Sequence, residues 1–503
     1  MSRRAATWCV LLLCSICKGS RANRRADVHG HAEKTTIAKE LGVRSVKKLV
    51  KATVSGLFGQ YEHSIDFQKS NDFVIVYGPN GVGKTKFIQI VCAAQSLDYG
   101  LLQAMPFSTA ELRYSDNVRL LVKRNELNSN LNEMGESVGV IEFELIGSNG
   151  KVERWMPYPI DFLKYLSRLS RFEFAGNGEW EDVRGGERYK LDELYRRYRR
   201  SRRSFRRSES EFDDYPEFLE YPLAFRKFSK QVSSYLIDTQ RLLSERYSTA
   251  HMVGSVEFMR AKRMASQARI NEYSDRLKDK LNKAQTEYSR LSQEKDRSFL
   301  SRVFKEAKKD VYRDPSKIIE RYDEQNQFRD RLAAVVKVDQ SSSLNLPDGE
   351  LENWALTLLD LYLQDAKEKF HPFEDILERI ELLQEILNKR LHGKRVEITA
   401  AEGLSVRRFD GVNIALDSLS TGEQHEIILM YDLLLNVQEG ATVFVDEPEI
   451  SLHVAWQLCF VPDVLRIAQL VGFRFVVATH SPQIINGMWD NAVEMGGESG
   501  EFE

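Results

Sequence analysis

The stretch "GPNGVGKT", residues Gly78 to Thr85, fits the pattern G-x-x-x-x-G-K-[ST] of a loop that holds phosphate. It follows "DFVIVY" (Asp72 to Tyr77), an apolar run rich in β-branched residues that is typical of a buried parallel strand. We therefore expect strand, loop and helix in the order that a phosphate-binding loop requires. The stretch predicts a nucleotide site and an α/β fold around it.

The residue types in this loop each have a physical task. Glycines let the backbone turn tightly, so that its N–H groups and the N-terminal end of the next helix face the phosphates. We expect Lys84 to reach the β- and γ-phosphates and the Thr85 hydroxyl to ligate Mg2+. The predicted ATP-binding residues of the loop are Gly78, Asn80, Gly81, Gly83, Lys84 and Thr85.

Composition excludes few classes of protein. The chain has 503 residues, a net charge of -2 and 29% charged residues, which suits two or three compact units and no global affinity for nucleic acid. Its five cysteines lack repeated C-x-x-C pairs and nearby histidines, which argues against a disulfide framework or a zinc site. We expect a cytoplasmic protein. No apolar stretch approaches the ~20 residues of a membrane span, which argues against a fused membrane transporter.

The N-terminus imitates a secretory signal. "MSRRAATWCVLLLCSICKGSRANRR" combines two early arginines, a short apolar run and small residues. Export would take a nucleotide-binding protein to a place without its nucleotide. We expect residues 1–46 to be a disordered leader or the product of a start codon assigned too far upstream.

The order of strand and helix patterns predicts a nucleotide-binding head split by insertions. "NVRLLVKR" (117–124) and "GVIEFELIG" (139–147) alternate like antiparallel strands beside the nucleotide-binding sheet. The expected divisions are a first head lobe at 47–175, a charged insertion at 176–232, a strand segment at 233–255 that ends near Gln240, a helical arm or subdomain at 256–394, and a second head lobe at 395–503.

The helical insertion carries one apolar stripe. An apolar residue recurs every seven positions, at Ile270, Leu277, Ala284 and Leu291. The second apolar position of each heptad, however, falls on the charged residues Lys280 and Glu287. This favours a short helical arm over a long coiled coil. "RDPSK" (313–317) should precede a second helix, and two more helices are expected from about 350 to 369 and from 373 to 391.

A run of arginines is the sharpest charge feature. "YRRYRRSRRSFRR" (195–207) interleaves eight arginines with aromatic residues, which suits phosphate contact and base stacking with DNA or RNA. The acidic "SESEFDDYPEFLEY" (208–221) follows at once and could instead neutralise the run as a charge-patterned hairpin. Both interpretations stay open.

Three later stretches add to the nucleotide site. "ATVFVDEPE" (441–449) is an apolar strand that ends in adjacent carboxylates. Asp446 is placed to hold Mg2+, and Glu447 to polarise the attacking water. "VVATHSPQII" (476–485) ends a strand at His480. "DSLSTGEQHEI" (417–427) puts Ser420 and Gly422 before a helix, where they form a second phosphate receptor without a lysine. One loop and one receptor per chain suggest pairing between chains.

In this order the motifs resemble the ABC-type ATPase heads, which include the SMC, RecF and OLD-like proteins. The resemblance implies an α/β fold, an ABC-type head with a P-loop mixed sheet, an antiparallel β layer and a large helical insertion. It makes Gln240 the Q-loop glutamine that contacts nucleotide and metal, Glu447 the catalytic glutamate and His480 the switch histidine. "LSTGEQ" is then the signature, with Thr421 where the family usually has glycine, and "EISLHVAWQ" (449–457) is the D-loop. Ser420 and Gly422 match the signature residues that, in that family, contact the γ-phosphate held by the other subunit.

A closer resemblance is to the PtuA-like ATPases of prokaryotic anti-phage systems of the Septu type. It is carried by "LSTGEQHEIILMYDLL", "DEPEISLHVAWQ" and "ATHSPQII". It implies ATP hydrolysis, a head-to-tail homodimer or higher oligomer, and a separate HNH nuclease, because the chain ends at Glu503 without room for the nuclease domain of OLD proteins. A DNA repair or maintenance ATPase and a non-hydrolysing nucleotide-sensing scaffold are the alternatives.

Overall fold

The computed structural model describes residues 46–68, 72–126, 139–156, 172–176, 179–190, 194, 222–237, 256–306, 312–336 and 351–496. The chain divides into two compact units, Met1–Lys47 and Lys48–Glu503. All helices and strands described below belong to the second unit. Of the expected leader, only residue 46 is among the described residues.

A five-stranded parallel sheet carries the phosphate-binding loop. Its strands follow the order β11 (Ser234–Ile237), β15 (Thr442–Asp446), β16 (Arg474–Thr479), β3 (Phe73–Tyr77) and β17 (Ala492–Glu494). All neighbouring pairs are parallel. Strands β3 and β15 are almost wholly buried, as expected for a parallel sheet covered on both faces. The carboxyl ends of all five strands therefore meet at one edge.

The antiparallel strands form a separate six-stranded sheet. Its order is β2 (Tyr61–Asp66), β1 (Leu49–Leu57), β4 (Thr109–Tyr114), β5 (Arg119–Glu126), β6 (Gly139–Ile146) and β7 (Val152–Trp155). This is the antiparallel layer that the sequence predicts, and the α/β head is confirmed. The parallel and antiparallel strands are sorted into two sheets. A small antiparallel sheet of β8 (Phe172–Gly176), β9 (Glu179–Asp182) and β10 (Arg188–Lys190) follows.

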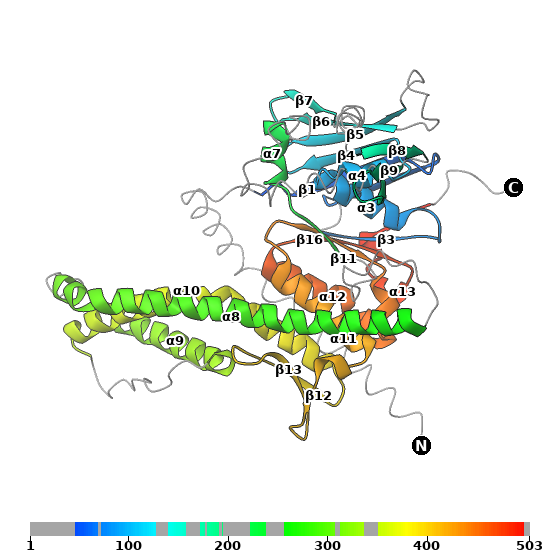
Figure 1. Ribbon diagram of the computed structural model, residues 1–503. Helices are drawn as coiled ribbons and strands as arrows, with labels where there is room; N and C mark the ends of the chain where they lie inside the picture. The colour runs from blue at the N-terminus through cyan, green and yellow to red at the C-terminus, as the bar shows by residue number, and fades with distance from the viewer. Residues whose placement is uncertain are drawn as a thin grey trace. The chain divides into compact units, whose positions relative to one another are not determined.

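The parallel sheet separates two hydrophobic cores. Alternate residues of β3 face opposite ways, because side chains alternate along a strand. Val74 and Val76 join a core with α3 (Lys84–Gln95) and the antiparallel sheet. Phe73 and Ile75 join a core with the arm helices, α11 (Thr421–Tyr431) and α12 (Val454–Val471). Figure 1 shows α3 on one side of β3 and β16, and α11 and α12 on the other.

Helix α12 is a core element of the head. Its length and apolar composition alone would suit a membrane span. However, Phe460, Val461 and Val464 are completely buried against the parallel sheet and its neighbours. A continuous apolar run of this length is also what a buried core helix requires. Among the described residues, no other helix passes this test of length and composition.

Three helices form the arm, and they are longer than the sequence suggested. They are α8 (Val256–Glu306), α9 (Pro315–Val335) and α10 (Asn353–Arg390), and α8 alone has 51 residues. The expected short arm is therefore wrong. The expected pair of helices at 350–369 and 373–391 is one helix that runs through Pro372. Phe370 and Phe373, both buried beside this proline, anchor the helix in the core on either side of the missing N–H.

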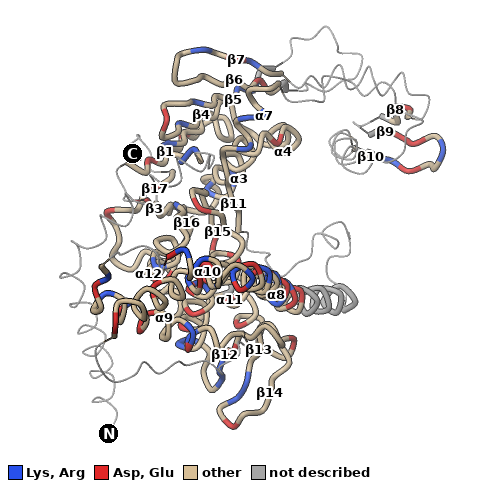
Figure 2. The backbone as a smooth tube through the Cα atoms, turned by 90° about the vertical axis from the view of Figure 1, so that its left-hand side faces the viewer, with Lys and Arg blue, Asp and Glu red and all other residues tan. Residues whose placement is uncertain are grey.

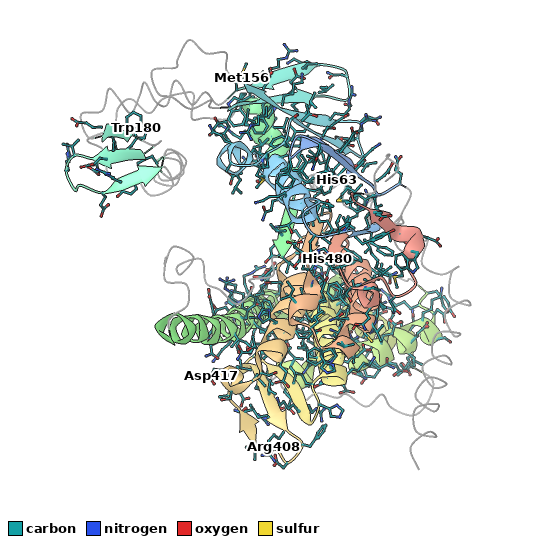
Figure 3. All side chains as sticks on the ribbon, turned by 90° about the vertical axis from the view of Figure 1, so that its right-hand side faces the viewer. His63, Met156, Trp180, Arg408, Asp417 and His480 are labelled. Carbon is teal, nitrogen blue, oxygen red and sulfur yellow. The ribbon has the colours of Figure 1, made fainter. Side chains whose placement is uncertain are left out.

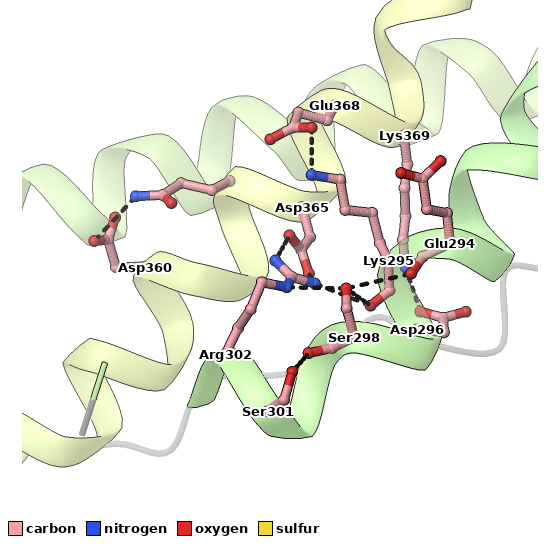
Figure 4. A network of polar contacts seen from close by, with 11 residues as sticks. Glu294, Lys295, Asp296, Ser298, Ser301, Arg302, Asp360, Asp365, Glu368 and Lys369 are labelled. Carbon is pink, nitrogen blue, oxygen red and sulfur yellow. Dashed lines mark hydrogen bonds and ion pairs between the residues drawn. The ribbon is translucent and has the colours of Figure 1, made fainter. Parts of the chain in front are cut away.

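The predicted apolar stripe faces the interior of the arm. Ile270 and Leu277 are buried, and the ring of Tyr288 stacks on Phe370 of α10 at 5.5 Å. Farther out, polar contacts join α8 to α10 (Figure 4): Arg302 binds Asp365, and Lys369 lies 2.7 Å from Asp296. Figure 2 shows residues of both signs mixed along these helices. The described part of the arm therefore carries charges of both signs.

The base of the arm is joined to the helix that follows the signature stretch. Helix α11 continues as a π-helical turn, η6 (Asp432–Asn436). Tyr273 of α8 donates a hydrogen bond of 2.9 Å to Asp432, and Arg379 of α10 donates one of 2.8 Å to the carbonyl of Leu434. Strands β12 (Lys394–Thr399), β13 (Gly403–Arg408) and β14 (Asn413–Ile414) then lead from α10 to the signature stretch.

Candidate functional site

The candidate site lies at the carboxyl edge of the parallel sheet. The phosphate-binding loop follows β3, Asp446 ends β15 and Glu447 comes next, and His480 follows β16. Strand β16 pairs with both β15 and β3, so it brings the two other segments to either side of His480. Figure 3 labels His480 at this edge. Ligands of open parallel sheets bind at such edges.

Two glycines of the loop are required by their surroundings. Gly83 has a φ of +93°, and a Cβ there would lie 2.5 Å from the side chain of Leu57. Gly78 has a φ of +152°, and a Cβ there would lie 2.2 Å from the carbonyl oxygen of Met495. Asn80 and Gly81 form the exposed tip of the loop. The chain thus passes close to the loop on two sides, and only glycine fits at these positions.

A histidine that the sequence reading missed supports the loop from the antiparallel sheet. His63 of β2 is buried, and its Nε2 lies 2.7 Å from the carbonyl oxygen of Val82 (Figure 3). Because a carbonyl only accepts, Nε2 must carry the proton. The His63 ring also stacks on Tyr61 and meets Phe87 of α3 edge-on. No sequence pattern signals this contact, because it joins two segments 19 residues apart through the tertiary fold.

Lys84 lies folded against its own loop. Its ammonium donates hydrogen bonds of 2.9 and 3.0 Å to the carbonyls of Gly78 and Pro79. Burial lowers the pKa of Lys84, against the opposing effect of the charges on Glu447, Asp446 and Glu449. The Lys84 ammonium is therefore held beside the first residues of the phosphate-binding loop.

Thr85 and Asp446 form a pair suited to a hard cation. The Thr85 hydroxyl donates a hydrogen bond of 3.2 Å to Oδ1 of Asp446, and Asp446 is buried. Both are oxygen ligands, which Mg2+ prefers, and Mg2+ commonly takes only one or two ligands from the protein beside phosphate and water. In the part of the chain that is described, no group of three or more His, Cys, Asp or Glu could hold a metal. The donor set therefore fits Mg2+ shared with a nucleotide.

His480 bridges Lys84 and Glu447. Its Nδ1 lies 3.5 Å from Nζ of Lys84, and its Nε2 lies 3.5 Å from Oε1 of Glu447. Because the ammonium only donates, this arrangement puts the imidazole proton on Nε2, facing the carboxylate. Glu447 itself has a left-handed backbone, with a φ of 44°. A non-glycine residue in this region costs free energy and is common at functional sites.

The signature residues are held by their own loop. Ser420 caps α11 and forms a capping box with Glu423, which lies 2.7 Å from Nζ of Lys394. Burial alone would raise the pKa of Glu423, but hydrogen bonds from Lys394 and Ser420 outweigh it and lower the pKa. The amide of Gln424 donates to the carbonyls of Leu416, Asp417 and Leu419. Gly422 lies in the first turn of α11.

The structure brings some predicted residues together and leaves others apart. Lys84, Thr85, Asp446, Glu447 and His480 converge at the carboxyl edge. Ser420 and Gly422 lie at the start of α11, whose buried residues pack in the core on the other face of the sheet from α3. Gln240 and the arginine run at 195–207 are outside the described residues.

The site has the groups that phosphoryl transfer to water requires. The loop and Lys84 provide donors for phosphate, and Glu447 provides a carboxylate that can orient and polarise water. A bound Mg2+ would neutralise charge on the phosphate oxygens. These parts define an ATPase head of the P-loop class with the element order of the ABC type.

Comparison with known proteins gives the family. Residues 57–485 match the model of the AAA ATPase domain family, which is most of the chain. The protein belongs to this family and is an ATPase. A comparison with curated protein sequences finds no match.

Solved structures with some likeness are SMC heads. The SMC head with an extended coiled coil from Pyrococcus furiosus, bound to the C-terminal domain of ScpA, shares 14% identity and a TM-score of 0.33, over 89% of this chain and 93% of that one. The SMC head from Thermotoga maritima shares 12% identity and a TM-score of 0.28, over 87% and 91%. Both likenesses are weak, and the family follows from the match over residues 57–485.

Proposed function

We propose that this ATPase is the nucleotide-hydrolysing subunit of a prokaryotic anti-phage complex, and that ATP-dependent pairing of two heads controls a separate HNH-type nuclease. The observation that carries the proposal is the separation of the signature from the phosphate-binding loop. Ser420 and Gly422 begin a helix packed on one face of the sheet, and the loop opens into α3 on the other. A second chain would supply the missing phosphate contacts.

The contacts of the described residues support the proposed roles, and the role of Gln240 is proposed from the resemblance of the motifs alone. Lys84 and the loop hold the phosphates, Thr85 and Asp446 hold Mg2+, with Gln240 as a further contact to nucleotide and metal. Glu447 polarises the attacking water, and His480, which lies between Lys84 and Glu447, senses the γ-phosphate. Ser420 and Gly422 act on the nucleotide of the partner copy.

The arm provides the mechanical link in this proposal. Its helices contact the π-helical turn after α11 through Tyr273 and Arg379, so a shift of the signature helix would move the arm base. The identity of the proposed partner, an HNH-type nuclease, is inferred from the resemblance of the motifs to PtuA-like ATPases. We place the protein in the cytoplasm, where ATP and phage DNA are both present.

The test is the native mass and composition of the tagged protein, purified with its genomic neighbours in the presence of ATP and Mg2+. We expect a complex of two or more heads with a nuclease subunit. A homodimer without a nuclease would contradict the defence role.

A DNA repair or maintenance ATPase is the second candidate. The observation in its favour is the length of α8, whose 51 residues span about 75 Å at 1.5 Å per residue. Such an arm suits a protein that reaches along DNA. A recombination protein in place of the nuclease in the purified complex would support this candidate.

The arginine run at 195–207 is the proposed nucleic-acid contact of either function. Replacing Arg199, Arg200, Arg202 and Arg203 with alanine should weaken DNA or RNA binding and flatten its dependence on salt, because each lost phosphate contact reduces the slope by about 1. Filter binding across a salt titration measures both quantities. If the slope of affinity against salt concentration is unchanged, the arginine run pairs with the acidic segment that follows it and does not contact nucleic acid.

A further inference from the structure

The backbone at His480 is held by a carboxylate that the proposed chemistry does not use. Glu449 lies two residues after Glu447, in the 3-10 turn η7 (Pro448–Ser451). Its Oε1 accepts a hydrogen bond of 2.7 Å from the Thr479 hydroxyl and one of 2.6 Å from the N–H of His480. Both are short bonds to an ionised acceptor, the kind that fixes geometry most strongly.

A second side chain holds the other side of the same turn. Gln457 of α12 accepts a hydrogen bond of 2.7 Å from the Ser481 hydroxyl. Its amide donates at 3.2 Å to the carbonyl of Leu452 and at 3.5 Å to that of Glu449. The residues on both sides of His480 are thus braced by the segment 449–457.

The ring of His480 depends on this brace for its position. Its side chain is 32% exposed, and its contacts with Lys84 and Glu447 are both at 3.5 Å, the outer limit of a hydrogen bond. Such weak contacts do not fix an imidazole by themselves. The buried side chain of Thr479 and the bonded N–H of His480 fix where the Cα–Cβ bond points.

We propose that Glu449 is a positioning residue for ATP hydrolysis, which acts by aiming His480 at the γ-phosphate position between Lys84 and Glu447. This inference rests on the role of His480 in the proposed function. The hydrogen bonds of Glu449 go to Thr479 and His480, and its effect on Lys84 of the loop is through charge alone. Its loss should therefore slow turnover and change nucleotide binding little.

The experiment is a double-mutant cycle in the full-length protein between Glu449→Ala and His480→Ala, with kcat and KM for ATP measured for each variant. We expect His480→Ala to lower kcat by about 100-fold, as for loss of one hydrogen-bond donor to charge that develops in the transition state. Glu449→Ala should lower kcat at least ~10-fold with KM within ~3-fold, the signature of an interaction lost only in the transition state. The double variant should be no slower than His480→Ala.

Two further variants separate positioning from folding. Glu449→Gln keeps an oxygen that accepts both hydrogen bonds, so it should restore most of kcat. Glu402→Ala removes an exposed glutamate on the β12–β13 sheet and should match the wild type. The affinity for a fluorescent ATP analogue and the thermal unfolding midpoint identify a variant that fails to fold.

The outcomes are distinct. Effects of Glu449→Ala and His480→Ala that multiply in the double variant, or a normal kcat for Glu449→Ala, would overturn the inference and leave the proposed role of His480 intact. A normal kcat for His480→Ala would overturn the role of His480 and the inference with it. A Glu449→Gln variant as slow as Glu449→Ala despite a normal fold would also contradict positioning through these hydrogen bonds.

Discussion

At the scale of single residues, the site is defined by contacts that leave no room for substitution. Gly78 and Gly83 combine a positive φ with a neighbour that would collide with any Cβ. Lys84 is held by two loop carbonyls, and His480 stands between Lys84 and Glu447. The shape of the phosphate-binding loop is therefore set by packing and by its own hydrogen bonds.

Gly83→Ala should abolish most ATP binding. The added methyl group meets Leu57 at 2.5 Å in a backbone that disfavours side chains, so the loop must shift. Gly59→Ala is the matched control, because Gly59 also has a positive φ, of +80°, but a Cβ there meets nothing within 4 Å. We expect Gly59→Ala to cost about 1 to 2 kcal/mol of stability with normal ATP affinity. Equal ATP affinities for the two variants, measured by calorimetry, would contradict this account of the loop.

Sequence could predict the candidate site residues that belong to motifs of fixed spacing at the ends of strands. Gly78 to Thr85, Asp446, Glu447 and His480 lie at or just after the end of an apolar strand, and parallel strands end at one edge. Glu449, Gln457 and His63 could not be predicted in the same way. Their contacts depend on how η7, α12 and β2 pack, and a lone glutamate, glutamine or histidine has many other roles.

At the scale of elements, the helices after the insertion are joined by buried charge. Arg390 at the end of α10 forms ion pairs with Glu426 of α11 and Asp463 of α12, and the Glu426 side chain is completely buried. Arg390 thus connects α10 of the arm, α11 after the signature stretch and α12, which begins within the D-loop stretch. Such a triad adds little net stability but makes each member depend on the others.

Arg390→Met should therefore destabilise the head by about 3 to 5 kcal/mol, because it leaves a buried carboxylate without its partner. The double variant Arg390→Met, Glu426→Leu should recover most of this loss. Urea unfolding of the three proteins measures the difference. A double variant less stable than Arg390→Met would show that the pair itself contributes the stability.

A second link between α10 and α12 should make stability depend on pH. Hydrogen bonds from Arg466 and Lys389 lower the pKa of Glu385 to about 2. Because the folded pKa is below the unfolded value of about 4.3, Glu385 stabilises the fold above that pH, and the contribution disappears as pH falls from there through 2. The side chain is 41% exposed, so the contribution should stay below about 1 kcal/mol.

Glu385→Gln measures this contribution. Its free energy of unfolding should be lower than that of the wild type at pH 7, and the two proteins should converge as the pH falls below 4. Glu402→Gln, on an exposed ion pair of the β12–β13 sheet, provides the control. A constant difference between wild type and Glu385→Gln from pH 7 to pH 3 would contradict the assignment.

The arm shows where element-scale prediction fails. The heptad drift onto Lys280 and Glu287 favoured a short helical arm over a long coiled coil. In the structure Lys280 donates to the carbonyl of Leu435, and Glu287 pairs with Arg290 on the surface of the same helix. Long helices packed side by side need no regular heptad when ion pairs such as Arg302–Asp365 and Lys369–Asp296 form part of the contact between α8 and α10. Likewise Pro372 reads as a break, yet the packing of Phe370 and Phe373 keeps α10 continuous.

At the scale of the whole molecule, α3 after the phosphate-binding loop and α11 after the signature stretch pack against opposite faces of the parallel sheet. The ATPase family, the α/β head and the helical insertion follow from the sequence, because each motif comes with its own strand or helix context. The sequence also suggests that heads pair, and this stays a prediction because it depends on a second copy. The central claim is that Ser420 and Gly422 of one chain complete the site formed by Lys84 of another.

The most direct measurement is trans-complementation of ATP hydrolysis between a Lys84→Ala chain and a Ser420→Arg chain. Each variant alone should be inactive, because every site in its homodimer lacks either the loop lysine or the signature serine. An equal mixture forms some dimers with one fully intact site, so random pairing should restore about a quarter of the wild-type rate. A mixture no more active than the average of the two variants, although both are folded and dimeric, would contradict a site shared between chains.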